Sequence, residues 1–93
     1  MIRYCVDVTA QDIRLGNKRN ADWCPIARAS TRAFGRPTCV GLDSICLYRG
    51  KTRRSKLGLQ LPLPYAAQVW ADAFDEGSEV APFSFDLEME VAP

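Results

Sequence analysis

The strongest constraint on the fold is a strict alternation of apolar and polar residues near the end of the chain. In PFSFDLEME, residues 82–90, the apolar members are Phe83, Phe85, Leu87 and Met89, and polar residues lie between them. A period of two residues places the two sets of side chains on opposite faces of a strand. The pattern therefore predicts a strand with one buried face and one face in water.

Two short helices are predicted in the first half of the chain. Thr9 can cap the first helix, Asp12 lies in its first turn, and Gly16 closes it. Pro25 suits the first position of the second helix, because its absent N–H would have no helical partner there. Gly35 is the predicted end of this second helix.

Four more strands and a third helix complete the expected order. The strands are predicted at residues 2–8, 38–42, 45–48 and 57–61. The third helix begins at Tyr65 or Ala66 and stops at Gly77, with an apolar stripe of Ala66, Val69, Trp70, Ala73 and Phe74. The order β-α-α-β-β-β-α-β predicts an α+β fold, a small and mostly antiparallel sheet with helices packed on one face.

Packing partners follow from the same patterns. We expect Phe83, Phe85 and Leu87 to lie on the covered face of the sheet, against Trp70 and Phe34. In the strand at residues 57–61, three leucines alternate with Gly58 and Gln60, so one face is expected to be buried.

Size and composition favour one small domain over residues 1–93, with no repeat and an ordinary globular composition. The first nine residues, MIRYCVDVT, contain two charges and no apolar run, so we expect neither a signal peptide nor a membrane span. We therefore expect a soluble protein of the cytoplasm, without contact to a membrane.

The chain has four cysteines and no histidine. Without histidine it cannot assemble a Ser-His or Cys-His nucleophile, and without a C-x-x-C pair a zinc site is not expected. The cysteines are predicted to be reduced, so we expect no metal, no cofactor and no enzyme activity. Cys24 before Pro25 has two interpretations, a reactive thiol at a helix start or a capping, buried residue, and we favour the second.

Charge is divided unevenly along the chain. All twelve Lys and Arg lie in residues 1–56 with only four Asp, which gives this part a net charge of +8. Residues 57–93 contain seven acids and no cation, a net charge of −7. The stretch RGKTRRSK, residues 49–56, is the tip of a predicted hairpin, and its cations are Arg49, Lys51, Arg53, Arg54 and Lys56.

The acids of the third helix lie where they are disfavoured. Asp72, Asp75 and Glu76 occupy its last turns, where the helix dipole opposes negative charge. Either they pair with the basic half of the chain, or they form an acidic face for a partner.

The predicted hairpin tip has several possible partners. It can lie along nucleic-acid phosphates, dock on an acidic protein surface, or block a nucleic-acid channel in another protein. Trp23, in a polar loop before a proline, is a candidate for stacking on bases, although aromatic residues are more often part of a core. No known base-reading motif accompanies the tip.

Two stretches resemble small accessory proteins of tailed bacteriophages. They are VTAQDIRLG followed by CPIARASTRAFG, and FDEGSEVAPFSFDL. The resemblance implies a phage origin, carries over no catalytic residue, and leaves the middle of the chain uncovered. By analogy it favours a non-enzymatic, anti-CRISPR-like inhibitor of a host protein or ribonucleoprotein complex that handles nucleic acid or serves defence. The alternative is a small nucleic-acid-binding protein that uses the same hairpin tip.

Overall fold

The computed structural model describes residues 2–89, in which the two ends of the chain pair with each other. Strand β1 (Ile2–Val8) runs antiparallel to β5 (Phe83–Met89), with Val6 opposite Phe85 and Tyr4 opposite Leu87. The polar residues of β5 are exposed, while Phe85 and Leu87 are buried. Both predicted strands are confirmed, and Glu90, which the sequence pattern also assigns to the second of them, lies outside the described residues.

Helix α1 (Ala10–Leu15) is held at its start by a reciprocal pair of hydrogen bonds. The Asp12 amide donates to the Thr9 hydroxyl at 3.1 Å, and the Thr9 amide donates to the Asp12 carboxylate at 3.0 Å. The helix ends at Gly16, where the backbone becomes extended, and a side chain would not fit there because a Cβ would lie 2.6 Å from Cδ of Pro25. The predicted cap and stop are confirmed.

Helix α2 (Pro25–Phe34) forms the centre of the core. It packs against β1 and against β2 (Thr38–Val40), with Ile26, Ala27 and Ala29 almost fully buried. Small side chains allow this close approach to the strands. Gly35 ends the helix with φ of 70°, a left-handed conformation that glycine adopts without strain.

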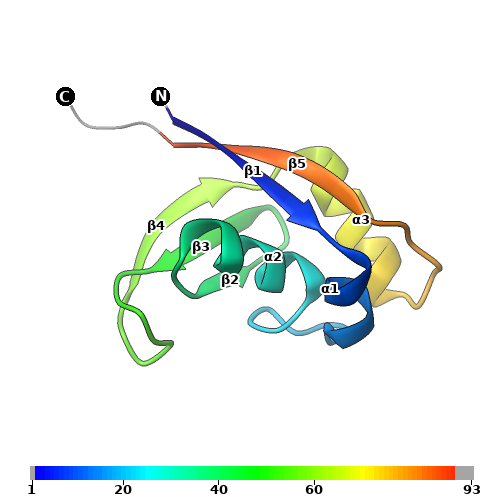
Figure 1. Ribbon diagram of the computed structural model, residues 1–93, viewed down its shortest axis with the longest axis horizontal. Helices are drawn as coiled ribbons and strands as arrows, with labels where there is room; N and C mark the ends of the chain where they lie inside the picture. Colours follow the sequence, from blue (N-terminus) through cyan, green and yellow to red (C-terminus); the bar gives the residue numbers. More distant parts are fainter. Residues whose placement is uncertain (1, 90–93) are drawn as a thin grey trace.

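The five strands form two sheets, whereas the sequence pattern favours one. Strand β2 pairs with β3 (Ser44–Tyr48), which pairs with β4 (Leu57–Pro62), all antiparallel. Strand β5 passes beside β4, but the two are not hydrogen-bonded as neighbours (Figure 1). The α+β class, the element order and the antiparallel pairing are confirmed.

Strand β4 does not bury its three leucines as expected. A bulge interrupts the β3–β4 register, because Tyr48 faces Leu57 while Cys46 faces Gln60. Leu61 is buried, but Leu57 and Leu59 stay about half exposed, so the expected buried face is wrong for these two. An extra residue in one strand disrupts the alternation of faces.

Helix α3 (Tyr65–Asp75) uses a different face from the one predicted. Its buried and half-buried apolar residues are Ala67, Trp70, Ala71, Ala73 and Phe74. Ala66 and Val69 are exposed, so the predicted stripe is wrong at these two positions. Trp70 stacks on Phe83 of β5 at 4.8 Å between ring centres, as expected.

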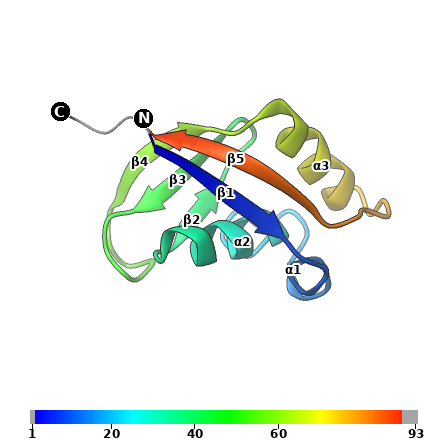
Figure 2. The same cartoon turned by 45° about the horizontal axis from the view of Figure 1, so that its top comes forward.

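The buried apolar side chains of α2, α3 and both sheets form one core cluster. Helix α1 contributes Ile13, which packs against this cluster. Phe34 packs at the edge of this cluster, where its ring centre lies 4.6 Å from that of Tyr4. Within β5, Phe83 is the residue whose ring stacks on Trp70. The molecule measures 42 × 27 × 21 Å, and the β3–β4 loop lies at one end of the long axis, away from the end of α3 (Figures 1 and 2). Within residues 2–89, no helix has the length and apolar character needed to cross a membrane.

Candidate binding surface at the hairpin end

The loop between β3 and β4, residues 49–56, is here named the hairpin end, and internal hydrogen bonds shape it. The Arg49 amide donates to the Lys56 carbonyl at 2.8 Å and closes its base. The Ser55 hydroxyl accepts from the Gly50 amide at 3.0 Å and donates to the Thr52 carbonyl at 2.6 Å. These bonds give the loop a defined shape, so its cations are held in a set arrangement.

Arg53 points back into the molecule, whereas the sequence places all five cations at an exposed tip. Its guanidinium donates to the Asp22 carboxylate at 3.0 Å and to the backbone carbonyls of Thr38 and Asp22 at 2.6 and 2.7 Å. Only 21% of the side chain is exposed. Arg53 is therefore a structural anchor that ties the hairpin end to the loop before α2.

Trp23 lies directly against this anchor. The centre of its ring is 4.6 Å from the guanidinium carbon of Arg53, and Tyr48 lies 5.7 Å from the same carbon. The Asn20 side chain accepts from the amides of Asp22 and Trp23, which fixes the loop. With 52% of its surface exposed, Trp23 is an outer aromatic surface beside the hairpin end.

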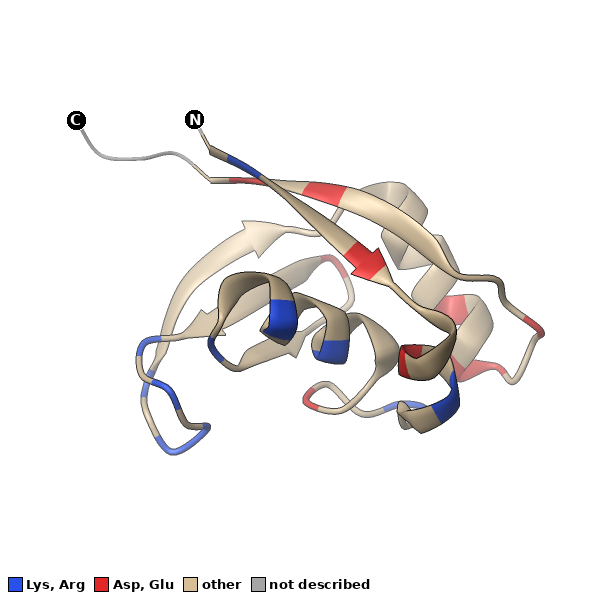
Figure 3. Ribbon diagram, in the orientation of Figure 1, with Lys and Arg blue, Asp and Glu red and all other residues tan. Residues whose placement is uncertain are grey.

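Four of the five predicted cations do project outward. Arg49, Lys51, Arg54 and Lys56 are exposed, and none forms an ion pair within the described part of the chain. Figure 3 shows them gathered on the hairpin end. Crowded like charges with no counter-charge raise the local positive potential, which attracts an anionic partner.

The three predicted acids lie toward the other end of the molecule. Asp72, Asp75 and Glu76 belong to the last turn of α3 and the position after it, on the side opposite the hairpin end (Figure 3). Asp75 accepts a hydrogen bond from the Arg19 amide at 2.9 Å, which offsets its poor position in the helix dipole. Among residues 2–89, none of the three forms an ion pair, so the geometry favours an acidic face over pairing with the basic half.

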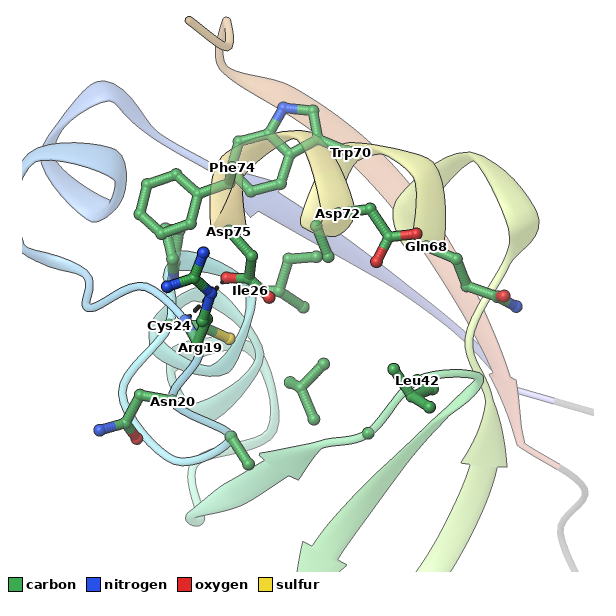
Figure 4. A pocket seen from close by; sticks show the side chains of 15 residues that line it. Arg19, Asn20, Cys24, Ile26, Leu42, Gln68, Trp70, Asp72, Phe74 and Asp75 are labelled. Atoms are coloured by element: carbon green, nitrogen blue, oxygen red, sulfur yellow. Dashed lines mark hydrogen bonds between the residues drawn. The ribbon is translucent and has the colours of Figure 1, made fainter. Parts of the chain in front are cut away.

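A cleft of about 250 Å³ lies beside this acidic face, between α3 and the loop before α2 (Figure 4). Ile26, Val40 and Phe74 contribute apolar side chains, and the carboxylates of Asp72 and Asp75 lie along it. The hairpin end and the acidic face are therefore separate surfaces, and the sequence alone did not show that a cleft adjoins one of them.

Of the four free cysteines, Cys24 is buried and has a structural role, whereas Cys5 is exposed. The Cys24 sulfur accepts from the Ala27 amide at 3.4 Å, and burial raises the pKa of this thiol, so the capping interpretation is confirmed. Cys39 and Cys46 face each other across β2 and β3 as free thiols. In the described part of the chain, no group of three or more Cys, Asp or Glu side chains is placed to hold a metal ion.

The ion pairs that organise the site could not be read from the sequence. Asp22 pairs with Arg53 across 31 positions, and Asp12 pairs with Arg32 across 20. Spacing gives no signal for such distant partners, because they meet only when the hairpin end and α2 are in place.

Comparisons of the chain with protein-family models, with curated proteins and with solved structures found no match. The resemblance to phage accessory proteins thus rests on the motifs alone. Within those motifs, Thr9 and Asp12 form the α1 cap, Cys24 caps α2, and Gly35 and Gly77 have φ of 70° and 86°. These residues shape the backbone, so the motifs carry information on fold rather than on chemistry.

Proposed function

We propose that this chain is a non-enzymatic binding protein of the phage accessory type. It inhibits a host complex that handles nucleic acid or serves defence, in the manner of an anti-CRISPR protein. The hairpin end is its main contact surface and the acidic face of α3 is a second one. The partner surface that meets the hairpin end is acidic.

This proposal rests on one observation. Four exposed cations without ion pairs among the described residues lie on a loop that internal hydrogen bonds hold in a defined shape. Holding Arg49, Lys51, Arg54 and Lys56 together without a counter-charge costs free energy in the isolated protein. An anionic partner relieves that repulsion and gains hydrogen bonds to the guanidinium groups. Because Arg53 anchors the loop, its backbone has little conformational entropy to lose on binding, and the entropic cost falls on the exposed side chains.

The nature of the host target rests on the resemblance of the two motifs. Phage accessory proteins of this size commonly act by binding host machinery. The cleft and acids at the far end of the molecule leave room for a second contact with the same complex.

A second candidate is direct binding to single-stranded nucleic acid, and Trp23 is the observation that favours it. An exposed aromatic ring beside a row of cations combines a stacking surface with phosphate contacts. The acids of α3 do not oppose this candidate strongly, because they lie on the side away from the hairpin end (Figure 3).

A capture experiment from host lysate tests the proposal. The bait is the wild-type chain or an Arg49→Glu, Arg54→Glu variant, with and without nuclease treatment. The matched control reverses two exposed cations elsewhere, Arg14→Glu and Lys18→Glu, with the same change in net charge. We expect the hairpin variant alone to lose the captured complex, and capture by the wild type to survive nuclease.

Salt dependence separates the two candidates with a purified partner. For single-stranded nucleic acid, neutralising about four phosphates gives log affinity a slope of about −3 against log salt. For an acidic protein surface, salt mainly slows association. If nuclease abolishes capture and the purified chain binds tightly to bare single strands, these results establish the second candidate, direct binding to nucleic acid. Full capture by the hairpin variant contradicts both.

A further inference from the structure

A second cleft lies at the base of the β3–β4 hairpin, and its lining differs from that of the cleft beside α3. It has a volume of about 240 Å³ and is formed where β1, the end of α2 and the β3–β4 hairpin meet. Its characteristic residues are Tyr4, Phe34, Arg36, Arg49, Gly58 and Leu59. We call it the aromatic cleft.

Three aromatic side chains line this cleft, those of Tyr4, Phe34 and Tyr48. Tyr4 of β1 and Phe34 of α2 contact each other with ring centres 4.6 Å apart and planes inclined by 49°. Both side chains are only half-buried, although α2 and β1 pack closely elsewhere. Leu59 of β4 is also about half exposed. Apolar and aromatic surface therefore remains uncovered at this point.

Two arginines supply the polar groups of the cleft. Arg36 follows the end of α2 and Arg49 begins the hairpin end, and both are exposed. Neither forms an ion pair within residues 2–89, and no acid in that range lines the cleft. The cleft beside α3, in contrast, is lined by Asp72 and Asp75 together with Arg19.

The position of the Arg49 side chain depends on the absence of a side chain at Gly58. A Cβ at Gly58 would lie 2.8 Å from Cγ of Arg49, closer than carbon atoms pack, so the stem of Arg49 lies against the bare backbone of β4. The bulge in β4 falls at this point. Bulges commonly redirect side chains beside binding sites.

We propose that the aromatic cleft binds one nucleotide unit, with its base against Tyr4 and Phe34 and its phosphate between Arg36 and Arg49. A volume of 240 Å³ is below the range of about 300–1,000 Å³ for pockets of drug-sized ligands, so the cleft can take the base of one nucleotide and not two. Stacking on an aromatic side chain combined with guanidinium contacts is a usual way to hold an unpaired nucleotide. The bound nucleotide unit is either a free mononucleotide or an unpaired nucleotide within a strand.

This site goes beyond the proposed function, because it does not depend on what the hairpin end contacts. Arg49 belongs to both surfaces, but Arg36 lies only in the aromatic cleft and Arg54 only in the hairpin end. Variants at these two arginines therefore separate the two proposals.

The test is an NMR titration of the full chain with AMP, read from the aromatic signals of Tyr4 and Phe34. Adenosine, inorganic phosphate, phenyl phosphate and a 5′-phosphorylated oligoadenylate of several residues are titrated in parallel. We expect saturable shifts with AMP, and affinity about a hundredfold weaker for adenosine, since it lacks the charge-assisted contacts to both arginines. If the oligonucleotide binds more tightly than AMP, the natural ligand is a nucleotide within a strand. If the two bind with equal affinity, the natural ligand is a free mononucleotide.

The variants complete the test. Arg36→Gln should weaken AMP about tenfold, the loss of one charge-assisted contact, while capture of the host complex stays intact. Arg54→Gln should leave AMP binding unchanged. No saturation by about 10 mM AMP overturns the proposal, as does a set of shifts that maps away from Tyr4 and Phe34. Tighter binding of phenyl phosphate than of AMP also overturns it, because it points to a phosphorylated tyrosine.

Discussion

The guanidinium carbon of Arg53 lies 4.6 Å from the ring centre of Trp23. This contact joins the hairpin end to the loop before α2, two segments that share no sequence pattern. It also divides the five cations of the hairpin end into one anchor and four outward charges. The shape of this surface therefore depends on Arg53, while the four other cations of the hairpin end stay exposed.

The neighbours Arg53 and Arg54 should differ sharply in their effect on stability. We expect Arg53→Gln to lower the free energy of unfolding by about 2–3 kcal/mol, because it removes charge-assisted bonds to two backbone carbonyls and a carboxylate. Arg54→Gln should change it by less than about 0.5 kcal/mol, as for other exposed positions. Urea unfolding followed by Trp fluorescence measures both. Equal stability of the two variants would mean that Arg53 does not anchor the loop in solution.

Phe85 should be among the most important side chains of the core. It is 8% exposed and lies opposite Val6 across the β1–β5 pair. We expect Phe85→Ala to cost about 3–5 kcal/mol, the usual range for a buried Phe. Leu59→Ala, at a half-exposed position in β4, serves as the control and should cost under about 1 kcal/mol. A reversed ranking in chemical denaturation would show that β5 does not face the core as described.

Asp12 should make stability depend on acid pH. Burial alone raises its pKa, but hydrogen bonds from Arg32 and Thr9 outweigh burial, and the net pKa lies below the ordinary value. A lowered folded pKa means that the stabilisation is complete above the unfolded pKa of about 3.9 and is lost as pH falls through the folded value.

The Asp12→Asn variant isolates this contribution. We expect it to cost about 3 kcal/mol at neutral pH, the lower end for breaking a buried ion pair, because Arg32 is itself half exposed. Melting temperatures between pH 2 and 7 should fall less steeply with acid in the variant than in the wild type. Parallel curves would assign the acid sensitivity to other carboxylates, such as Asp7, whose pKa is lowered by bonds from Ser84 and Cys5.

Folding should not require a metal ion or a disulfide. All four cysteines are free in this structure, and Cys24 caps α2 as a thiol. Thermal melts with a chelator and with a reductant should therefore match the untreated protein within about 2 °C, well below the shift that 1 kcal/mol produces in a domain of this size. A large drop with either reagent would contradict this expectation.

Local features of the chain were predictable from the sequence because they depend on neighbours only a few positions apart. The Thr9–Asp12 capping box, the start of α2 at Pro25 and the alternation along β5 all involve groups within one or two turns. Backbone geometry alone brings such residues together, so the element order and the α+β class followed from the pattern.

The tertiary structure decided the features for which the sequence allowed more than one solution. The predicted apolar stripe of α3 is residues 66, 69, 70, 73 and 74, and the buried or half-buried set is residues 67, 70, 71, 73 and 74. Packing against β5 and the core therefore keeps three predicted positions and replaces Ala66 and Val69 by Ala67 and Ala71. The bulge in β4 exposes Leu59. Asp22 forms an ion pair with Arg53 of the hairpin end, because the folded chain brings the two side chains together. The charge content could thus be counted from the sequence, but which charges stay exposed and unpaired among the described residues depended on contacts between residues far apart in the chain.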